Sequence, residues 1–541
     1  MTPSRRRVRP TPRQGAQRLT VRALFSECNL PLWLDVAADL AQEQGWRPVY
    51  WVGQQSLAGR LAQAFPQAVF HDHLRAIRGL PAAGGPDPAP LDQEILAEMA
   101  PCEAMVLRIL DRMDPVDCFG LRERLDLYYR YLGYWSAVLD KYQPQVAFFS
   151  IAPHMAYDYV LYALCQRRGI PTMMLEQALI NSRLYVTSRY DGPDNLVQRE
   201  YRRLLAADQG GPIDLPADMV EHLEALTRDY QAPFYVARIE SRGGPLDWAR
   251  LWLECKSLPR RALNLGLRLH QLLTTPAPAN YMKVRGRRFS ERPISHLGFE
   301  YYRWLGRRAR ARLKDQYQAL AGPEPLDRPY VYLPLHYQPE MSTMPTGGYY
   351  DDQRLLAGLI CSCLPPGWLL YVKEHPVQVA DIGRGQISRP PGYYQDLLAL
   401  PQVRLVPLTQ SSFELMDHAR ATATITGQAA WEAVNRGKPA LTFGHCWYKG
   451  CEGISFIRGR RELCQALERV AAGQVTVDRR KVRLFALAVA RVARQGYVEP
   501  IFGQAYNLDQ RENSRGISRM LGDYWQHEAR GAGLGGGGES S

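Results

Sequence analysis

The sequence predicts an α/β fold with two Rossmann-like units that face each other across a cleft, and two observations lead to this prediction. Segments with the length and apolar content of strands alternate with segments of helical periodicity, first from Leu19 to about residue 176 and again from residue 330 to about 444. The strand segments are almost continuously apolar, which is typical of parallel strands covered by helices on both faces. At 541 residues the chain is also too long for one hydrophobic core.

The first alternation begins with the apolar segment TVRALFS at 20–26. Leu32, Val36 and Leu40 then recur at helical spacing. Gly45 is expected to end this helix, because glycine readily adopts the left-handed conformation found at helix ends. The further elements expected in this unit are strands at 47–53, 145–153 and 172–176, and helices at about 121–141 and 155–168.

The second alternation begins with YVYLPLHY at 330–337. Two such units facing each other form the GT-B arrangement, in which ligands are expected outside the carboxyl ends of the strands. The further strands expected here are 369–376, 403–408, 421–426 and 439–444, and the expected helices are at about 352–361, 393–400, 411–419 and 428–436.

The segment between the two alternations is strongly basic. Residues 235–315 hold 18 Lys and Arg against 6 Asp and Glu, within a chain whose net charge is +13. We expect a helical, solvated face that braces the two units, with contact to an anionic membrane surface as the second hypothesis. Nucleic-acid binding is not expected, because no zinc finger, helix-turn-helix or RNP-type motif accompanies the charge. The expected organisation is a disordered basic tail (1–17), an N-terminal domain (18–230), a basic helical insert or linker (231–325), a C-terminal domain (326–525) and a disordered Gly-rich tail (526–541).

The ten cysteines and the lengths of the apolar runs indicate the cellular compartment of the protein. No two cysteines are spaced as CxxC, and Cys28, Cys165 and Cys464 lie in apolar surroundings, so we expect reduced core thiols. No apolar run is long enough to span a bilayer, and no apolar core follows the N-terminal arginines. The expected location is therefore the cytoplasm, with peripheral contact to the inner membrane as a further hypothesis.

Polar residues followed by proline end two strands of the second unit. In Lys373-Glu374-His375-Pro376, the proline ends the strand, and the imidazole of His375 is placed to donate to a phosphate oxygen. The alternative is a strand-end histidine that bonds only to the backbone. In HYQPE, whose polar residues are His336, Gln338 and Glu340, the carboxylate is placed to orient a ribose hydroxyl, a lysine or a sugar, and the alternative is a solvated turn. The predicted binding residues of these two motifs are His336, Gln338, Glu340, Lys373, His375 and Pro376.

A third motif, TITGQAAWEA, follows the strand at 421–426. Gly427 allows the backbone to approach a ligand, and the helix that follows offers free N–H groups to an anion. Glu432 lies one turn into this helix, where it could bind ribose hydroxyls. Ser411 and Ser412 begin another helix and are also candidates for holding phosphate, although plain helix capping explains both turns equally well. The predicted binding residues here are Thr426, Gly427, Gln428, Glu432, Ser411 and Ser412.

Taken together, HYQPE, KEHP and TGQAAWEAVNRGKPALTFGHCWY resemble the C-terminal half of the capsule polysaccharide biosynthesis proteins, most specifically over residues 330–448. This family includes Kdo transferases, and its His-Pro element is similar to that of bacterial sialyltransferases. The resemblance extends to Glu176, Arg183 and the DGPDN segment at 191–195, whereas Ala178 stands where the family usually has glycine.

The resemblance implies a GT-B glycosyltransferase that moves a sugar, such as Kdo or a related acidic sugar, from a nucleotide donor to a capsular or other surface glycan or its lipid-linked acceptor. It also implies that His375 binds the donor phosphate, that Gly427, Gln428 and Glu432 line the nucleotide pocket, and that Glu340 lies near the donor. A CMP-linked donor is favoured over a UDP-linked one, and no cofactor is expected. The N-terminal domain would then hold the acceptor and the C-terminal domain the nucleotide sugar.

An inverting transfer needs a carboxylate that deprotonates the acceptor hydroxyl, and this group should come from the N-terminal domain. Glu176 is the first candidate because it ends the strand at 172–176, Asp158 is the second and Glu27 the third. Each could instead cap a helix or pair with an arginine. No DxD-type metal motif stands at a strand end, and Asp351-Asp352 is expected to cap the next helix, so metal-independent transfer is expected.

Two alternatives stay open at the level of sequence. A UDP-sugar transferase or UDP-sugar epimerase shares the same fold, and a non-catalytic capsule assembly or export factor would keep the cleft without turnover. The choice between them depends on which nucleotide binds and on whether Glu176 and His375 are needed.

Overall fold

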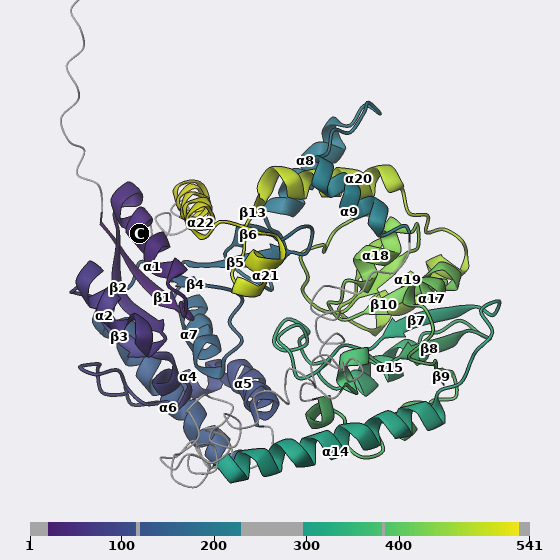
Figure 1. The fold of residues 1–541 in the computed structure, drawn as a ribbon, viewed down its shortest axis with the longest axis horizontal. Helices are drawn as coiled ribbons and strands as arrows, with labels where there is room; N and C mark the ends of the chain where they lie inside the picture. The colour runs from purple at the N-terminus through teal and green to yellow at the C-terminus, as the bar shows by residue number, and fades with distance from the viewer. Residues whose placement is uncertain (1–19, 115–119, 229–295, 381–384, 530–541) are drawn as a thin grey trace, which may run out of the picture.

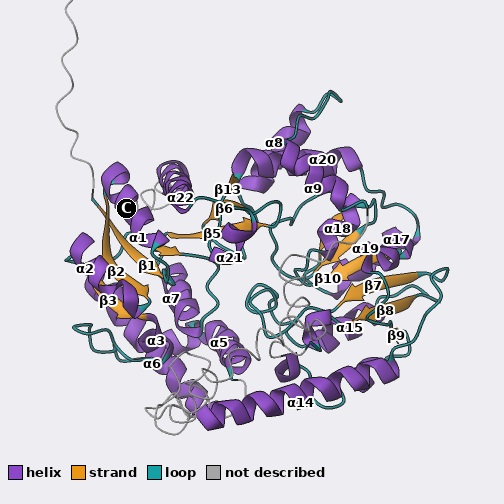
Figure 2. Ribbon diagram, viewed as in Figure 1, coloured by secondary structure: helices purple, strands orange, loops and turns teal. Residues whose placement is uncertain are grey.

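The computed structural model describes residues 20–114, 120–228, 296–380 and 385–529. The expected tail at 1–17 and most of the expected basic segment at 235–315 lie outside these residues. Within them, two sheets form the centres of two α/β units, one on either side of the view in Figures 1 and 2. The predicted fold class, two parallel-cored α/β units, is thus confirmed.

The first sheet has seven strands in the order β13-β6-β5-β4-β1-β2-β3. The five strands from β5 to β3 are parallel, and β6 and β13 are antiparallel to their neighbours. Side chains alternate across this sheet, so that Leu24 packs with α5, α6 and α7, while Ala23 and Phe25 pack on the opposite face with α1. The strands are β1 (Val21–Ser26), β2 (Trp46–Gly53), β3 (Val69–Asp72), β4 (Val146–Phe149), β5 (Thr172–Ala178), β6 (Arg183–Thr187) and β13 (Arg494–Gln495).

The helices of this part of the chain follow the predicted periodicity. Gly45 ends α1 with a φ of 73°, as expected. The helices are α1 (Leu32–Gln44), α2 (Ala58–Ala64), α3 (His73–Ile77), α4 (Gln93–Glu98), α5 (Ala100–Met113), α6 (Leu121–Tyr142), α7 (Ala156–Arg167), α8 (Leu196–Ala207) and α9 (Ala217–Ala225).

The second sheet has six strands in the order β12-β11-β10-β7-β8-β9, all parallel. Val331 and Leu333 face one layer of helices, and Tyr330 and Tyr332 face the other. The strands are β7 (Tyr330–Pro334), β8 (Leu369–Lys373), β9 (Val403–Leu405), β10 (Ala421–Thr424), β11 (Ala440–Thr442) and β12 (Ile454–Phe456); the helices are α14 (His296–Leu320), α15 (Gln353–Cys361), α16 (Tyr393–Leu398), α17 (Ser412–His418), α18 (Ala429–Asn435), α19 (Arg460–Ala471) and α20 (Arg479–Val492).

The chain then returns to the first unit. β13 pairs with β6, and the last helix, α22 (Gln510–Tyr524), packs with α1 through Ile517 and Leu521, after the short helix α21 (Pro500–Ala505). This return, visible in yellow beside α1 in Figure 1, is a feature that the predicted single domain at 326–525 does not include.

The cysteines depart from the expectation in one place. Cys363 and Cys464 form a disulfide between the end of α15 and helix α19, where reduced thiols were expected. The sequence did not reveal the pair because the two residues are 101 positions apart and come together only through packing. The six other cysteines among the described residues are free and buried. None of the helices in the described ranges is long and apolar enough to cross a membrane.

Candidate active site

Three loops of the second unit meet at one edge of its sheet. β10, β7 and β8 are adjacent and parallel, so the residues that follow them lie at the same edge. His336 follows β7, His375 follows β8, and Gly427 follows β10. We call these strand-end loops, 335–340, 374–376 and 425–428, the second-sheet edge.

His336 is in direct contact with the loop after β10. Its Nε2 lies 3.0 Å from Oγ1 of Thr424 and accepts a hydrogen bond from the Thr426 N–H at 3.3 Å. Burial lowers the pKa of His336 to about 3, and nearby His375 and Arg389 act in the same direction. The ring of His336 is therefore neutral, and its Nε2 holds the loop after β10 in place. It does not provide a positive charge for a phosphate group.

His375 is placed differently. Its Nδ1 accepts a hydrogen bond from the Val377 N–H at 3.2 Å, which leaves the ring hydrogen of the neutral tautomer on Nε2. Burial lowers the pKa of His375 to about 4, against the opposing charge of Glu374. At neutral pH the ring is therefore an uncharged N–H donor. Pro376 follows as the first residue of a short 3₁₀ turn.

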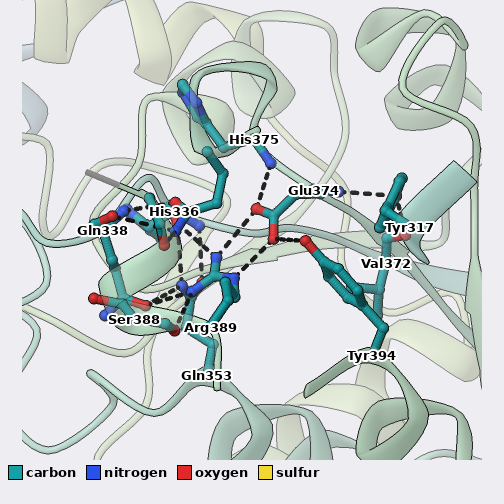
Figure 3. A network of polar contacts seen from close by, with 12 residues as sticks. Tyr317, His336, Gln338, Gln353, Val372, Glu374, His375, Ser388, Arg389 and Tyr394 are labelled. Carbon is teal, nitrogen blue, oxygen red and sulfur yellow. Dashed lines mark hydrogen bonds and ion pairs between the residues drawn. The ribbon is translucent and has the colours of Figure 1, made fainter. Parts of the chain in front are cut away.

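A buried ion pair lies beneath these loops, and sequence reasoning missed it. Arg389 and Glu374 have no exposed side-chain surface, and their closest contact, from Nε to Oε2, is 2.7 Å (Figure 3). Arg389 also donates to the His336 carbonyl at 3.1 Å and to Oε1 of Gln338 at 2.8 Å, and Oε1 of Glu374 accepts from the His375 N–H at 2.7 Å. The pair thus ties the β7 loop to the β8 loop. The only signal in the sequence was an acid at a buried strand end, which requires a partner.

Lys373, Ser411 and Ser412 form a separate group. The Lys373 ammonium donates to the Gln410 carbonyl and to Oγ of Ser412 at 3.1 Å, and burial lowers the pKa of the lysine to about 8. Ser411 caps α17 by accepting from the Glu414 N–H at 3.3 Å. Contacts within the protein therefore explain the polar groups of all three residues without a bound phosphate.

The loop after β10 requires glycine at position 427. A Cβ there would lie 2.8 Å from Oγ1 of Thr424 and 3.1 Å from Cε1 of His336. Oε1 of Gln428 accepts from the Trp447 indole at 3.2 Å. Burial raises the pKa of Glu432 to about 7, and its carboxylate has no hydrogen-bond partner within the described ranges.

Glu340 is exposed and lies in the loop that leads from β7 towards α15. It accepts from the Ser342 hydroxyl at 2.7 Å, and the Ser342 carbonyl accepts from the Thr426 hydroxyl at 2.5 Å, so this loop touches the second-sheet edge. Desolvation of its carboxyl group raises the pKa of Glu340, and nearby Glu499 adds to the effect.

A cavity of about 290 Å³ lies where the two units meet. The Arg112 side chain, from α5, reaches across this junction by donating to the Met344 carbonyl at 3.2 Å, and Arg108 pairs with Asp351 at 2.5 Å. The lining residues include Asp111 and Arg112 from the first unit and Gln338, Met344, Arg354 and Tyr393 from the second.

The three predicted bases lie at two separate positions in the structure: Glu176 at one, and Glu27 with Asp158 at the other. Glu176 accepts from the Tyr185 hydroxyl at 2.6 Å. Burial raises the pKa of Glu176 to about 7, although Tyr185 and the ammonium of Lys449 act in the opposite direction. Lys449 belongs to the second unit and donates to the Gly192 carbonyl at 3.3 Å, so Glu176 lies at the contact between the units.

Glu27 and Asp158 lie together in the first unit, with residues that sequence reasoning missed. Oε2 of Glu27 is 3.0 Å from Nδ1 of His73 and accepts from the Tyr157 hydroxyl at 2.6 Å. Asp158 is buried and accepts from the His154 N–H at 3.3 Å. We call Glu27, His73, His154, Tyr157 and Asp158 the Glu27 cluster. The signal for His73 was the HDH sequence at 71–73, which ends a strand.

The pKa values of the two carboxyl groups of this cluster are shifted in opposite directions. Burial would raise the pKa of Glu27, but the charge and hydrogen bond of His73 outweigh it and bring the pKa to about 2. Burial and the charge of Glu27 hold the pKa of Asp158 well above its usual range. Glu27 is therefore an anion, whereas the pKa of Asp158 is shifted in the opposite direction.

Arg183 and the segment 191–195, to which the family resemblance extends, form contacts within the protein. Arg183 pairs with Asp218 at 2.5 Å, Asp191 with Arg189 at 2.9 Å, and Asn195 caps α8.

No metal site is evident in the described ranges: they contain no group of three or more His, Cys, Asp or Glu side chains arranged to hold a metal ion. Asp352 caps α15 by accepting from the Arg354 N–H at 3.1 Å.

Comparison with solved structures gives distant matches. The KpsC β-Kdo 2,7-transferase of Thermosulfurimonas dismutans is 12% identical, with a TM-score of 0.28, and the match covers 74% of this chain and 95% of that one. The KpsC β-Kdo 2,4-transferase of the same organism is 16% identical, with a TM-score of 0.25 and coverage of 65% and 81%. The UDP-GlcNAc 2-epimerase of Neisseria meningitidis is 10% identical, with a TM-score of 0.23 and coverage of 93% and 99%.

In sequence, no curated protein matches this chain. A family match covers residues 281–472, which include β7, β8, β10 and the three loops of the second-sheet edge. Residues 281–472 of this chain are therefore similar to the family described as capsule polysaccharide biosynthesis proteins.

Proposed function

We propose that this protein is a glycosyltransferase that moves a sugar from a nucleotide donor to a capsular or other surface glycan, with the donor bound at the second-sheet edge. The observation that carries the proposal is the meeting of three strand-end loops at that edge, in the segment that matches the capsule biosynthesis family. Ligands of open α/β sheets bind outside the carboxyl ends of the strands.

The donor phosphate is assigned to His375. A neutral ring with its hydrogen on Nε2 donates to a phosphate oxygen without the cost of burying a charge. The ribose is assigned to Glu432, because this residue is half-buried and its carboxylate has no hydrogen-bond partner within the described ranges. Thr426, Gly427 and Gln428 are assigned to the same side of the nucleotide, and Glu340 lies on the loop that contacts Thr426.

The donor is expected to be CMP-linked, and Kdo or a related acidic sugar is the expected group to be transferred. This choice rests on the resemblance to Kdo transferases rather than on a contact within the protein. The acceptor is assigned to the first unit, whose sheet edge carries Glu176 and the Glu27 cluster. A lipid-linked acceptor would place the protein at the inner membrane surface.

A binding experiment tests the donor assignment. A ligand that binds only the folded state stabilises it by about 2.7 kcal/mol when present at one hundred times its Kd. Thermal unfolding with CMP, CMP-sugars, UDP and UDP-sugars is expected to show stabilisation by the CMP series. Stabilisation by UDP compounds alone would indicate that the donor is a UDP-sugar, as in the epimerase alternative.

Turnover separates the transferase from a non-catalytic assembly or export factor. Release of CMP from a CMP-sugar, with an acceptor glycan present, is expected from the wild-type chain. A chain that binds CMP but releases none, and whose Glu176→Ala and His375→Ala variants still support capsule export in cells, would contradict the enzymatic assignment.

A further inference from the structure

The Glu27 cluster holds a histidine whose hydrogen position is fixed by its neighbours. Nδ1 of His73 lies 3.0 Å from Oε2 of Glu27 and 3.2 Å from the Tyr157 hydroxyl. The single hydroxyl hydrogen of Tyr157 is already donated to Glu27 at 2.6 Å. Nδ1 therefore faces two acceptor oxygens, and it must carry a hydrogen.

The consequence is that the lone pair of neutral His73 lies on Nε2. This atom has no hydrogen-bond partner in the part of the chain that the structure describes, and 11% of the side chain is exposed. A carboxylate that holds one ring nitrogen of histidine fixes the tautomer and makes the other nitrogen a better base. Glu27 and His73 thus form a carboxylate–imidazole dyad with its basic end unused.

The backbone at Glu27 is unusual in a way that fits a functional role. Its φ is 59°, in the left-handed region that residues other than glycine rarely adopt. The conformation follows the carboxyl end of β1 and brings the carboxylate to His73, which follows β3. Local strain of this kind concentrates at functional sites, where the surrounding structure holds it in place.

The cluster also lies next to the junction of the two units. The Arg112 side chain donates both to the His154 carbonyl, within the cluster, and to the Met344 carbonyl, in the loop beyond β7. The charge of Arg112 also acts on Glu340 of that loop. One side chain thus connects the cluster with the loop that touches the second-sheet edge.

We propose that His73, held by Glu27, is the group that accepts the proton of the acceptor hydroxyl. This inference rests on the proposed function. As the acceptor oxygen forms its bond to the anomeric carbon of the donor sugar, its proton passes to Nε2 of His73. The bond from the anomeric carbon to the phosphate oxygen breaks, and the nucleotide leaves with that electron pair. Glu27 stabilises the imidazolium that results and is a positioning residue.

The charges around His73 determine the direction in which its pKa is shifted. Burial would lower it, but the carboxylates of Glu27 and Asp72 outweigh burial and raise the pKa above its usual value of 6.5. The other titratable groups close to the ring are Tyr157 from α7, His154 before α7, and His71 from β3. Since the base must be neutral, kcat is expected to rise with pH through this raised pKa, and the Glu27→Gln change is expected to shift the rise to lower pH.

The test uses the full-length chain with the CMP-sugar that it turns over, and measures CMP release. His73→Ala and His73→Gln are expected to lower kcat by about 10² to 10⁴-fold while the thermal shift produced by CMP stays unchanged. Added imidazole is expected to restore part of the turnover of His73→Ala. His418→Gln is the matched control, because this histidine is exposed on α17 and bonds only to its own helix.

The outcomes are distinguishable. Wild-type turnover in His73→Gln, or no effect of imidazole on folded His73→Ala, would overturn the proposal. So would loss of turnover in Glu176→Gln but not in His73→Gln, because Glu176 would then take the proton. No turnover by the wild-type chain with any nucleotide sugar would instead overturn the proposed function itself. Independently of activity, nitrogen NMR of labelled histidine is expected to find the Nδ1–H tautomer at His73, and an Nε2–H tautomer would overturn the dyad.

Discussion

Among single residues, two histidines at neighbouring strand ends have different tasks. His336 uses its Nε2 on Thr424 and Thr426, whereas His375 keeps its Nε2–H for a ligand. The sequence placed both at the second-sheet edge but could not separate their tasks. The tautomer of each ring depends on a backbone N–H, from Val377 or from Thr426, and no sequence pattern reports this.

Replacing His375 by alanine is expected to weaken CMP binding by roughly tenfold to a hundredfold, because a hydrogen bond to a charged group contributes about 1.5–3 kcal/mol. Titration calorimetry with CMP measures the change. His418→Ala should leave the affinity unaltered. Equal affinities for His375→Ala and the wild type would exclude His375 as the phosphate ligand.

Glu432 leads to a prediction about pH. Burial raises its pKa from 4.5 to about 7 in the folded protein, so the folded state holds a proton that the unfolded state has lost between these two values. The carboxyl group therefore lowers stability progressively as pH rises from about 4.5 to 7. Glu432→Gln is expected to unfold at a higher temperature than the wild type at pH 8, with the difference vanishing near pH 4.5. A difference that does not change with pH would contradict the raised pKa.

At the scale of elements, the loops of the second-sheet edge are held together from below. Arg389 and Glu374 connect the β7 loop with the β8 loop, and both are fully buried. The strands themselves could be predicted because their apolar runs are long and end in proline or glycine. The ion pair could not, because Arg389 lies in an irregular segment, where the sequence has no periodicity to indicate burial.

Breaking this pair is expected to be costly. Arg389→Met leaves the Glu374 carboxylate buried without its partner, and removal of one member of a buried pair lowers the free energy of unfolding by about 3–5 kcal/mol. Denaturant unfolding measures this. The matched control is Arg404→Met, which removes a partly exposed arginine from Glu324 and is expected to change stability by about 1 kcal/mol or less. Similar losses in both variants would contradict the role of the buried pair.

Gly427 offers a second test at this scale. An alanine Cβ would lie 2.8 Å from Oγ1 of Thr424, so either the threonine or the loop must move. Overpacking of this kind costs about 1–3 kcal/mol. Gly427→Ala is therefore expected to lower both the unfolding temperature and the affinity for CMP. Gly358→Ala is the control, because nothing lies within 4 Å of a Cβ at that position. If Gly427→Ala binds CMP as tightly as the wild type, this loop is not part of the donor site.

At the scale of the whole molecule, two sheets present their strand ends to a shared junction, and side chains such as Arg108, Arg112 and Lys449 connect the units there. The alternation of strands and helices predicted both sheets. It could not predict the return of β13 and α22 to the first unit, because a short edge strand and an amphipathic helix carry no signal of which core they join. The contacts of the Glu27 cluster were equally hidden, since they join strand ends far apart in sequence.

A structure of the protein with CMP would show whether the second-sheet edge binds the nucleotide of an activated sugar. We expect a phosphate oxygen within hydrogen-bond distance of Nε2 of His375, with the ribose next to Glu432 and the loop of Gly427. CMP bound elsewhere, with His375 and Glu432 free of contact to it, would show that the second-sheet edge is not the donor site.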